Sequence, residues 1–166
     1  MWKRCIQMAM LLSLLTIGIG GLWGCSNTPA VASHTPEEIT AVAISYAGMD
    51  RSVNYSFWLR NEADTWLFDA TCFIHQNEVE TELVGCPVTA EEKDACMSIL
   101  VENDTITYVE NHASTKQNHV ADAESTSIVL TFSDGTQCMA SGTQPALEAF
   151  FYSLAETYAD ASPSVS

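Results

Sequence analysis

Residues 125–141 (STSIVLTFSDGTQCMAS) carry the pattern that most limits how this chain can fold. Large apolar side chains recur at every second position, at Ile128, Leu130 and Phe132. This is the period of a strand with one buried face. The pair Asp134-Gly135 follows, and it favours a two-residue hairpin turn because both positions of such a turn need a positive φ. We therefore predict an antiparallel hairpin in which Thr131 lies opposite Cys138, so that Cys138 points away from the apolar side.

Four earlier segments are rich in the β-branched and aromatic residues that favour strands. They are residues 39–48, 54–60, 64–74 and 78–85. The third segment (DTWLFDATCFI) alternates, and one of its faces carries Trp66, Phe68, Ala70, Cys72 and Ile74. Turn residues separate successive segments, which indicates an antiparallel meander.

Two helices are expected. Thr89 and Glu92 have the spacing of a capping box, and the helix that they begin runs to about residue 102. Residues 143–160 place their apolar side chains on one stripe and predict a second amphipathic helix. We expect a short strand at 104–110 and a long polar loop at 111–125. Together the segments predict an α+β fold: a mainly antiparallel sheet of about five to seven strands, with two helices on one face.

The amino-terminal segment has the pattern of an export signal. Lys3 and Arg4 precede a nearly uninterrupted apolar run over 6–23. A permanent transmembrane helix is the alternative interpretation. The glycines of the segment disfavour it, because glycine destabilises the interior of a helix. The run ends in Leu22-Trp23-Gly24-Cys25, which resembles the lipobox of bacterial lipoproteins. Trp23 departs from the small residue usual at that position. The resemblance implies that Cys25 receives a diacylglycerol and becomes the first residue after cleavage.

The expected organisation follows from this cleavage. It comprises a signal peptide (1–24), a flexible tether (25–38), one α+β domain (39–160) and a disordered tail (161–166). Cleavage leaves four basic and 21 acidic side chains, a net charge of −17. So acidic a chain repels phosphate, which excludes nucleic acid as a favoured partner. The acyl chains on Cys25 would then be its contact with the membrane, and the domain would lie on the extracytoplasmic side of the cell membrane.

Four cysteines remain once Cys5 leaves with the signal and Cys25 is acylated. They are Cys72, Cys86, Cys96 and Cys138. An even number in an exported domain indicates two disulfides with three possible pairings. We favour Cys72–Cys96 with Cys86–Cys138, and the other two pairings stay open. No CxxC pair is present, so a zinc site is not expected.

The sequence contains no motif of catalysis or of phosphate, dinucleotide or zinc binding. We expect no cofactor and no metal. Three groups of side chains could still carry chemistry. The first is His112 and His119 with Glu110, Asp122 and Glu124, which a solvated loop explains equally. The second is Glu78, Glu80 and Glu82, where a paired-carboxylate site competes with the wet side of a strand. The third is Tyr46, Tyr55, Trp58 and Trp66, which could line a ligand surface or belong to the core.

Two functions fit these observations. The first is a membrane-anchored lipoprotein with a small non-catalytic domain that binds a ligand or partner in the cell envelope. The alternative is a small envelope hydrolase that acts on cell-wall material. The part of the chain after Cys25 resembles surface lipoproteins of Gram-positive bacteria only loosely, and this resemblance implies no mechanism.

Overall fold

The computed structural model describes residues 33–74, 80–113 and 125–161. Within these ranges the chain forms a six-stranded sheet, three α-helices and two 3₁₀ turns. The strands are β1 (Ile39–Ala47), β2 (Tyr55–Glu62), β3 (Thr65–Cys72), β4 (Thr81–Pro87), β5 (Ser125–Phe132) and β6 (Gln137–Ser141). The helices are α2 (Ala90–Glu102), α3 (Thr105–Asn111) and α4 (Pro145–Ala161), and the 3₁₀ turns are η1 (Pro36–Glu38) and η2 (Arg51–Val53).

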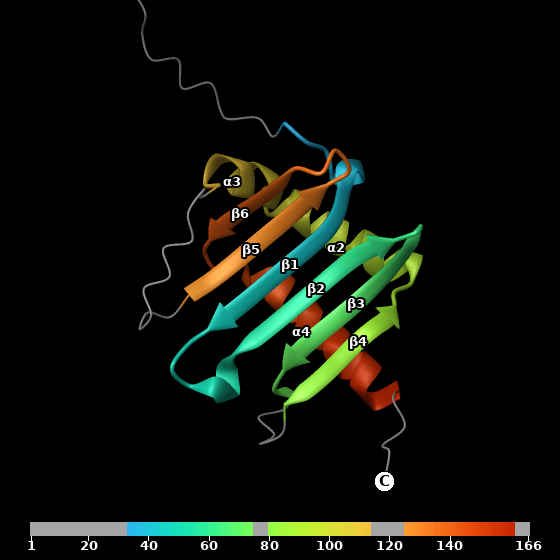
Figure 1. Ribbon diagram of the computed structural model, residues 1–166, viewed down its shortest axis with the longest axis vertical. Coiled ribbons are helices and arrows are strands. Elements are labelled where there is room, and N and C mark those ends of the chain that lie inside the picture. Colours follow the sequence, from blue (N-terminus) through green and yellow to red (C-terminus); the bar gives the residue numbers. More distant parts are fainter. Residues whose placement is uncertain (1–32, 75–79, 114–124, 162–166) are drawn as a thin grey trace, which may run out of the picture. The chain divides into compact units, whose positions relative to one another are not determined.

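The sheet is antiparallel throughout, in the order β4-β3-β2-β1-β5-β6. Strands β1 to β4 form a meander, and β5 then pairs with the free side of β1 (Figure 1). The hairpin between β2 and β3 turns through Ala63 and Asp64, whose φ values of 49° and 68° are those of a tight two-residue turn. The predicted antiparallel α+β fold is confirmed.

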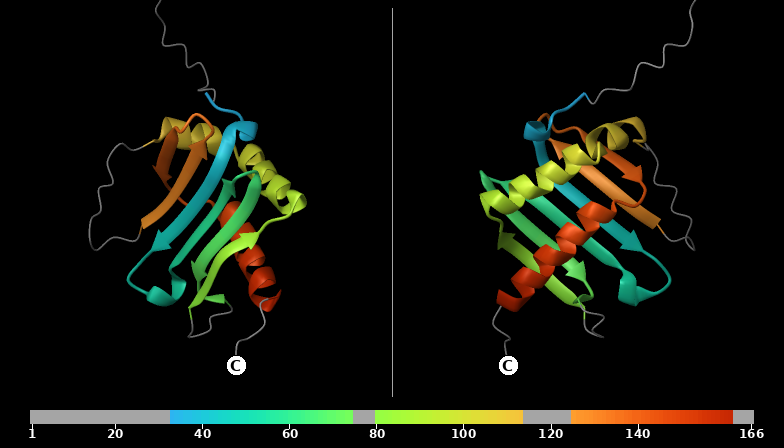
Figure 2. Two further views of the ribbon diagram at one scale, coloured as in Figure 1. Left: turned by 45° about the vertical axis from the view of Figure 1, so that its right-hand side comes forward. Right: turned by 180° about the vertical axis from the view of Figure 1, so that it is seen from behind.

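All three helices pack on the same face of the sheet. Figure 2 shows α4 crossing the strands diagonally and α2 lying across one end of the sheet. Helix α3 contacts β5 and β6. The opposite face, which is turned toward the viewer in Figure 1, carries no helix of the described residues. The structure therefore has two layers, and the sheet has one covered and one uncovered face.

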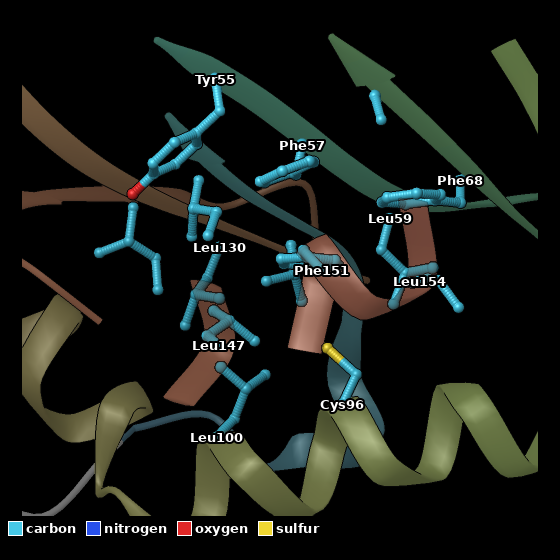
Figure 3. Packing of buried hydrophobic residues seen from close by; sticks show 14 of the residues in the cluster. Tyr55, Phe57, Leu59, Phe68, Cys96, Leu100, Leu130, Leu147, Phe151 and Leu154 are labelled. Atoms are coloured by element: carbon cyan, nitrogen blue, oxygen red, sulfur yellow. The ribbon is translucent and has the colours of Figure 1, made fainter. Parts of the chain in front are cut away.

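The core lies between the sheet and the helices (Figure 3). Alternate residues of each strand supply it, as the period of a strand requires. Phe57, Phe68 and Phe151 are buried and stack, with ring centroids 5.7 to 6.1 Å apart. Cys96 and Leu100 project from α2 into the same space. The predicted buried face of residues 64–74 is thus correct: Phe68, Ala70, Cys72 and Ile74 are buried, and Trp66 packs against the core.

The capping box at the start of α2 is also confirmed. The Thr89 hydroxyl accepts a hydrogen bond from the Glu92 backbone N–H, and the Glu92 carboxylate accepts one from the Thr89 N–H. Tyr158 of α4 donates a further hydrogen bond to this carboxylate at 3.0 Å. Partial burial alone would raise the pKa of Glu92, but these hydrogen bonds outweigh it and lower that pKa.

The strand expected at residues 104–110 is wrong, because this segment is helix α3. Thr105, Ile106 and Val109 are buried on one side of it, at the spacing of a helical turn. Their β-branched character favours a strand, but packing against the sheet outweighs this weak preference. Asp104 has φ 50°, a left-handed conformation that interrupts the helical backbone and separates α2 from α3.

The hairpin between β5 and β6 exists, but its turn and register differ from the prediction. Only Gly135 has a positive φ (86°), so Asp134-Gly135 does not form the predicted two-residue turn. The Gly135 N–H instead bonds the Phe132 carbonyl, and the loop is one residue longer. Leu130 therefore lies opposite Cys138. A shift of one residue reverses the direction of every side chain, and Cys138 packs against the core instead of facing away.

Candidate functional site

The uncovered face of the sheet carries the side chains that alternate with those of the core. Its register aligns a row of small hydroxyl residues across five strands, with Glu82 completing the row on β4. The row reads Ser141, Ser127, Ser45, Ser56, Thr71 and Glu82. Ser45 and Ser127 hydrogen-bond to each other at 2.8 Å. This polar row is what an uncovered sheet face needs in order to stay hydrated.

The next row contains the exposed aromatic residue of this face. Trp58 is 46% exposed and lies between Ala43 of β1 and Asp69 of β3. Arg60, two residues further on the same strand, places its guanidinium carbon 4.8 Å from the centroid of the Trp58 ring. This is a cation–π distance. One side of the indole is therefore supported by Arg60.

Arg60 is itself held in place by two carboxylates. Its Nε donates to Asp69 at 2.8 Å, and it also pairs with Glu62. Asp69 accepts a second hydrogen bond, at 2.6 Å, from the Gly85 N–H. Gly85 lies in a bulge of β4, with φ 65°, that directs this N–H toward β3. Partial burial alone would raise the pKa of Asp69, but Arg60 and the Gly85 N–H lower it, so this carboxyl is ionised at neutral pH.

A hollow of about 280 Å³ opens beside Trp58. The side chains around it include Ser56, Trp58, Asp69, Thr71, Glu82 and Val84. Arg60, which lies over the Trp58 ring, is not among the residues that line the hollow. The hollow therefore combines an aromatic ring, two hydroxyls and two carboxylates, which are groups that can orient a ligand.

A larger hollow, of about 380 Å³, lies between η1 and the outer side of α2. Its lining includes Lys93, Met97 and Glu102 but no aromatic residue. Lys93 and Asp94 form an ion pair at its border, but this pair joins sequence neighbours and supports no aromatic ring, unlike the pair of Asp69 with Arg60. We take the hollow at Trp58 as the candidate site, because its groups are held in place.

The four aromatic residues singled out in the sequence lie on different faces. Tyr55 is buried in the core, and Tyr46 and Trp66 pack against it. Only Trp58 lies on the uncovered face. Of the two alternatives that the sequence left open, the core is therefore correct for Tyr46, Tyr55 and Trp66, and the exposed surface holds for Trp58. The alternation of β2 directs Tyr55 and Trp58 to opposite faces.

The thiols of Cys72, Cys86, Cys96 and Cys138 are all free in the structure, so neither favoured disulfide is formed. Cys86 and Cys138 lie on the two edge strands, five strand spacings of about 4.8 Å apart. A disulfide needs Cα atoms within about 7 Å, so this pair cannot be bridged within one chain. Burial raises the pKa of Cys72 to about 11 and that of Cys96 to about 12, which keeps both thiols protonated.

The described members of the candidate His and acidic groups do not lie together. His112 hydrogen-bonds to the Tyr108 carbonyl and stacks on its ring, while Glu110 binds a different histidine. His119, Asp122, Glu124 and Glu78 lie outside the described residues. Glu80 is exposed just before β4, and Glu82 is the member that reaches the hollow. No group of three metal-binding side chains occurs in the described ranges.

Residues 33–38, predicted as part of the tether, contact the domain. His34 stacks on Phe132 with ring centroids 4.0 Å apart, and its Nδ1 lies 2.6 Å from Glu110. Ser33 donates two more hydrogen bonds to the same carboxylate, and His34 Nε2 lies 3.4 Å from Asp134. The hydrogen bond with Glu110 raises the pKa of His34, with a further contribution from Asp134. The sequence analysis missed this cluster because its partners are 76 and 100 residues away.

Cys25 and the whole lipobox lie outside the described residues. None of the described helices is long and apolar enough to cross a membrane. Comparison of the chain with protein-family models, with curated proteins and with solved structures finds no match. The candidate site therefore has to be interpreted from its own chemistry.

Proposed function

We propose that this protein is a lipid-anchored, extracytoplasmic binding protein that presents the uncovered face of its sheet to a ligand of the cell envelope. The observation that carries the binding role is the fixed array at Trp58, beside a hollow lined by polar groups. Trp58 is held in one orientation by its cation–π contact with Arg60, and the ion pair with Asp69 holds Arg60 in place.

The anchoring role rests on the sequence alone. Leu22-Trp23-Gly24-Cys25 follows a basic and then apolar segment, and the acyl chains that a lipobox implies would bind firmly, at roughly 0.8 kcal/mol for each buried CH₂. The strong negative charge of the remaining chain disfavours direct adhesion to anionic lipid. A lipid would therefore hold the protein at the membrane while leaving the sheet free to bind.

Anchoring is tested by a single substitution. We expect Cys25→Ala to leave the chain uncleaved and without acyl groups, as measured by mass spectrometry of the membrane fraction. Cys5→Ala is the matched control and should be processed normally. Acylation that persists in Cys25→Ala would refute the lipobox assignment.

Binding is tested with insoluble envelope material from the host. We expect the full chain in detergent to sediment with it, and Trp58→Ala to lose about tenfold in retention. Val101→Ala is the control, because Val101 is also an exposed apolar residue but lies on α2. Equal retention of Trp58→Ala and the unmodified protein would rule out this face as the binding surface.

One observation favours the alternative function, a hydrolase: Asp69 and Glu82 both line the hollow. A glycosidase needs one carboxyl with a raised pKa to act as general acid. Asp69 is shifted the opposite way, and so is every other described carboxyl group whose pKa departs from its usual value. Binding is therefore the better-supported function. Release of soluble fragments that stops in Glu82→Gln would reverse this choice.

A further inference from the structure

We infer that the hollow beside Trp58 binds a neutral saccharide ring. This inference rests on the proposed function and names the class of ligand for the same site. The C–H face of a pyranose is apolar and packs on an aromatic ring, while its hydroxyls require acceptors and donors around the rim. The hollow offers both kinds of surface.

The polar groups stand in a line beside the indole. Ser56 lies opposite Thr71, and Thr71 lies opposite Glu82, so the three side chains come from three neighbouring strands. Strand spacing sets them about 5 Å apart. This is close to the width of one pyranose, so hydroxyls on opposite sides of a sugar ring can each meet a side chain. The hydroxyls of Ser56 and Thr71 donate or accept, and the Glu82 carboxylate accepts.

The charge around the hollow selects against ionic ligands. An anion would meet Glu82 and Asp69 in a chain of strongly negative net charge. A cation would share the indole with Arg60, which already lies over it. Asp69 is already paired with Arg60, and the remaining attraction to the exposed Glu82 would be a surface ion pair, which contributes little. A neutral polyhydroxylated ring meets neither penalty.

Arg60 and Asp69 fix the Trp58 indole before a ligand binds. Arg60 is bound by Asp69, and Asp69 is bound by Gly85, so the indole does not have to be ordered when a ligand arrives. Binding then loses less side-chain entropy, which matters for weak carbohydrate affinities. Arg60 and Asp69 act here as positioning residues, whereas Trp58, Ser56, Thr71 and Glu82 contact the sugar.

The test is a titration of the full chain in detergent, followed by the NMR signals of the Trp58 indole N–H and of the backbone amides at positions 56 and 71, which line the same hollow and remain in every variant. The neutral probes are tri-N-acetylglucosamine, maltotriose, mannotriose and xylotriose. The charged probes are triglucosamine, which differs from the first probe by its amino groups, and trigalacturonate. We expect at least one neutral probe to bind with a Kd on the order of 1 mM, and the charged probes to bind at least tenfold more weakly.

Variants distinguish residues that contact the sugar from residues whose loss only disturbs folding. We expect Trp58→Ala to abolish binding, Trp58→Phe to retain part of it, and Ser56→Ala with Thr71→Ala to weaken it severalfold. Val101→Ala should change nothing. Circular dichroism verifies that each variant is folded.

Several outcomes would overturn the inference. They are preferential binding of triglucosamine or trigalacturonate, binding that survives in Trp58→Ala, and no binding of any neutral probe at about ten times the expected Kd. If neutral probes fail but envelope material still depends on Trp58, the inference is wrong and the proposed function stands. If envelope retention is also independent of Trp58, both are wrong.

Discussion

The two faces of the sheet are made by the same strands but obey different constraints. Phe57 and Trp58 are neighbours on β2, yet Phe57 is fully buried among aromatic rings while Trp58 is 46% exposed. The covered face is fixed by the need to remove apolar surface from water. The uncovered face is free of that need, and we propose that its ordered Trp58, Arg60 and Asp69 serve ligand binding. The following predictions compare the two faces and the elements that create them.

The largest effect is expected from the neighbouring pair on β2. Phe57→Ala should lower the free energy of unfolding by about 3 to 5 kcal/mol, because it leaves a cavity between Phe68 and Phe151. Trp58→Ala should cost only about 0.5 to 1 kcal/mol, the contribution of an exposed cation–π contact. Denaturant unfolding measures both. Similar losses in the two variants would contradict the distinction between the faces.

The ion pair on the uncovered face should contribute less. Asp69→Asn is expected to cost about 1 to 2 kcal/mol, a charged hydrogen bond discounted for partial exposure. Since the pKa of Asp69 is lowered by folding, its contribution is present above the usual value of 3.8 and is lost as the pH falls through the lowered one. Denaturant unfolding below about pH 4 should therefore show a smaller difference between variant and parent.

Asp64→Asn is the matched control for this substitution. Asp64 lies in the turn between β2 and β3 with φ 68°, a conformation that asparagine also adopts. It should leave the unfolding free energy nearly unchanged. A cost in Asp64→Asn equal to that in Asp69→Asn would mean that charge in general, and not the bond to Arg60, is responsible.

The stability of α2, one of the helices that cover the sheet, depends on its N-terminal cap at Thr89. Thr89→Ala should lower the free energy of unfolding by about 1 kcal/mol, because it leaves the Glu92 backbone N–H without its acceptor. Thr157→Ala is the control, since Thr157 is an exposed residue in the interior of α4. Denaturant unfolding should show no loss for it. Binding at Trp58 should survive Thr89→Ala, which would separate the cover from the site.

The smallest effect is expected at His34. The raised pKa of His34 means that its stabilising contribution is full below 6.5 and is lost as the pH rises through the raised value. His34→Gln should therefore speed hydrogen exchange of the Glu38 amide near pH 6 and have little effect near pH 9. The direction is opposite to that for Asp69. An equal effect at both pH values would show that the imidazolium charge is not involved.

Much of the fold was predictable from local patterns. The alternation in β3, the capping box at Thr89 and the apolar stripe of α4 each depend on residues close together in the sequence. Helix α3 was not predictable in this way, because its β-branched residues favour a strand and only packing on β5 and β6 decides otherwise. The predicted register of the β5–β6 hairpin was wrong because the loop has one additional residue. This residue reverses the direction in which the Cys138 side chain points.

The candidate site shows the same division. The sequence named Trp58 as an aromatic of interest, and the apolar face predicted for residues 64–74 leaves Asp69 on the opposite face of that strand. The sequence could not show that Trp58 and Asp69 are neighbours, because this depends on the register of β2 against β3 and on the bulge at Gly85. It also could not distinguish Trp58 from Tyr55 and Trp66, which point into the core.

By itself, the amino-acid sequence determined the α+β class, the antiparallel meander and the principal helix boundaries, because these follow from short-range periodicity and capping. It is also the sole basis for the proposed lipid anchor at Cys25. Only the tertiary structure decided which sheet face is uncovered, which thiols are too far apart to pair and which side chains surround Trp58. Those features depend on contacts between distant residues, and a local pattern carries no information about them.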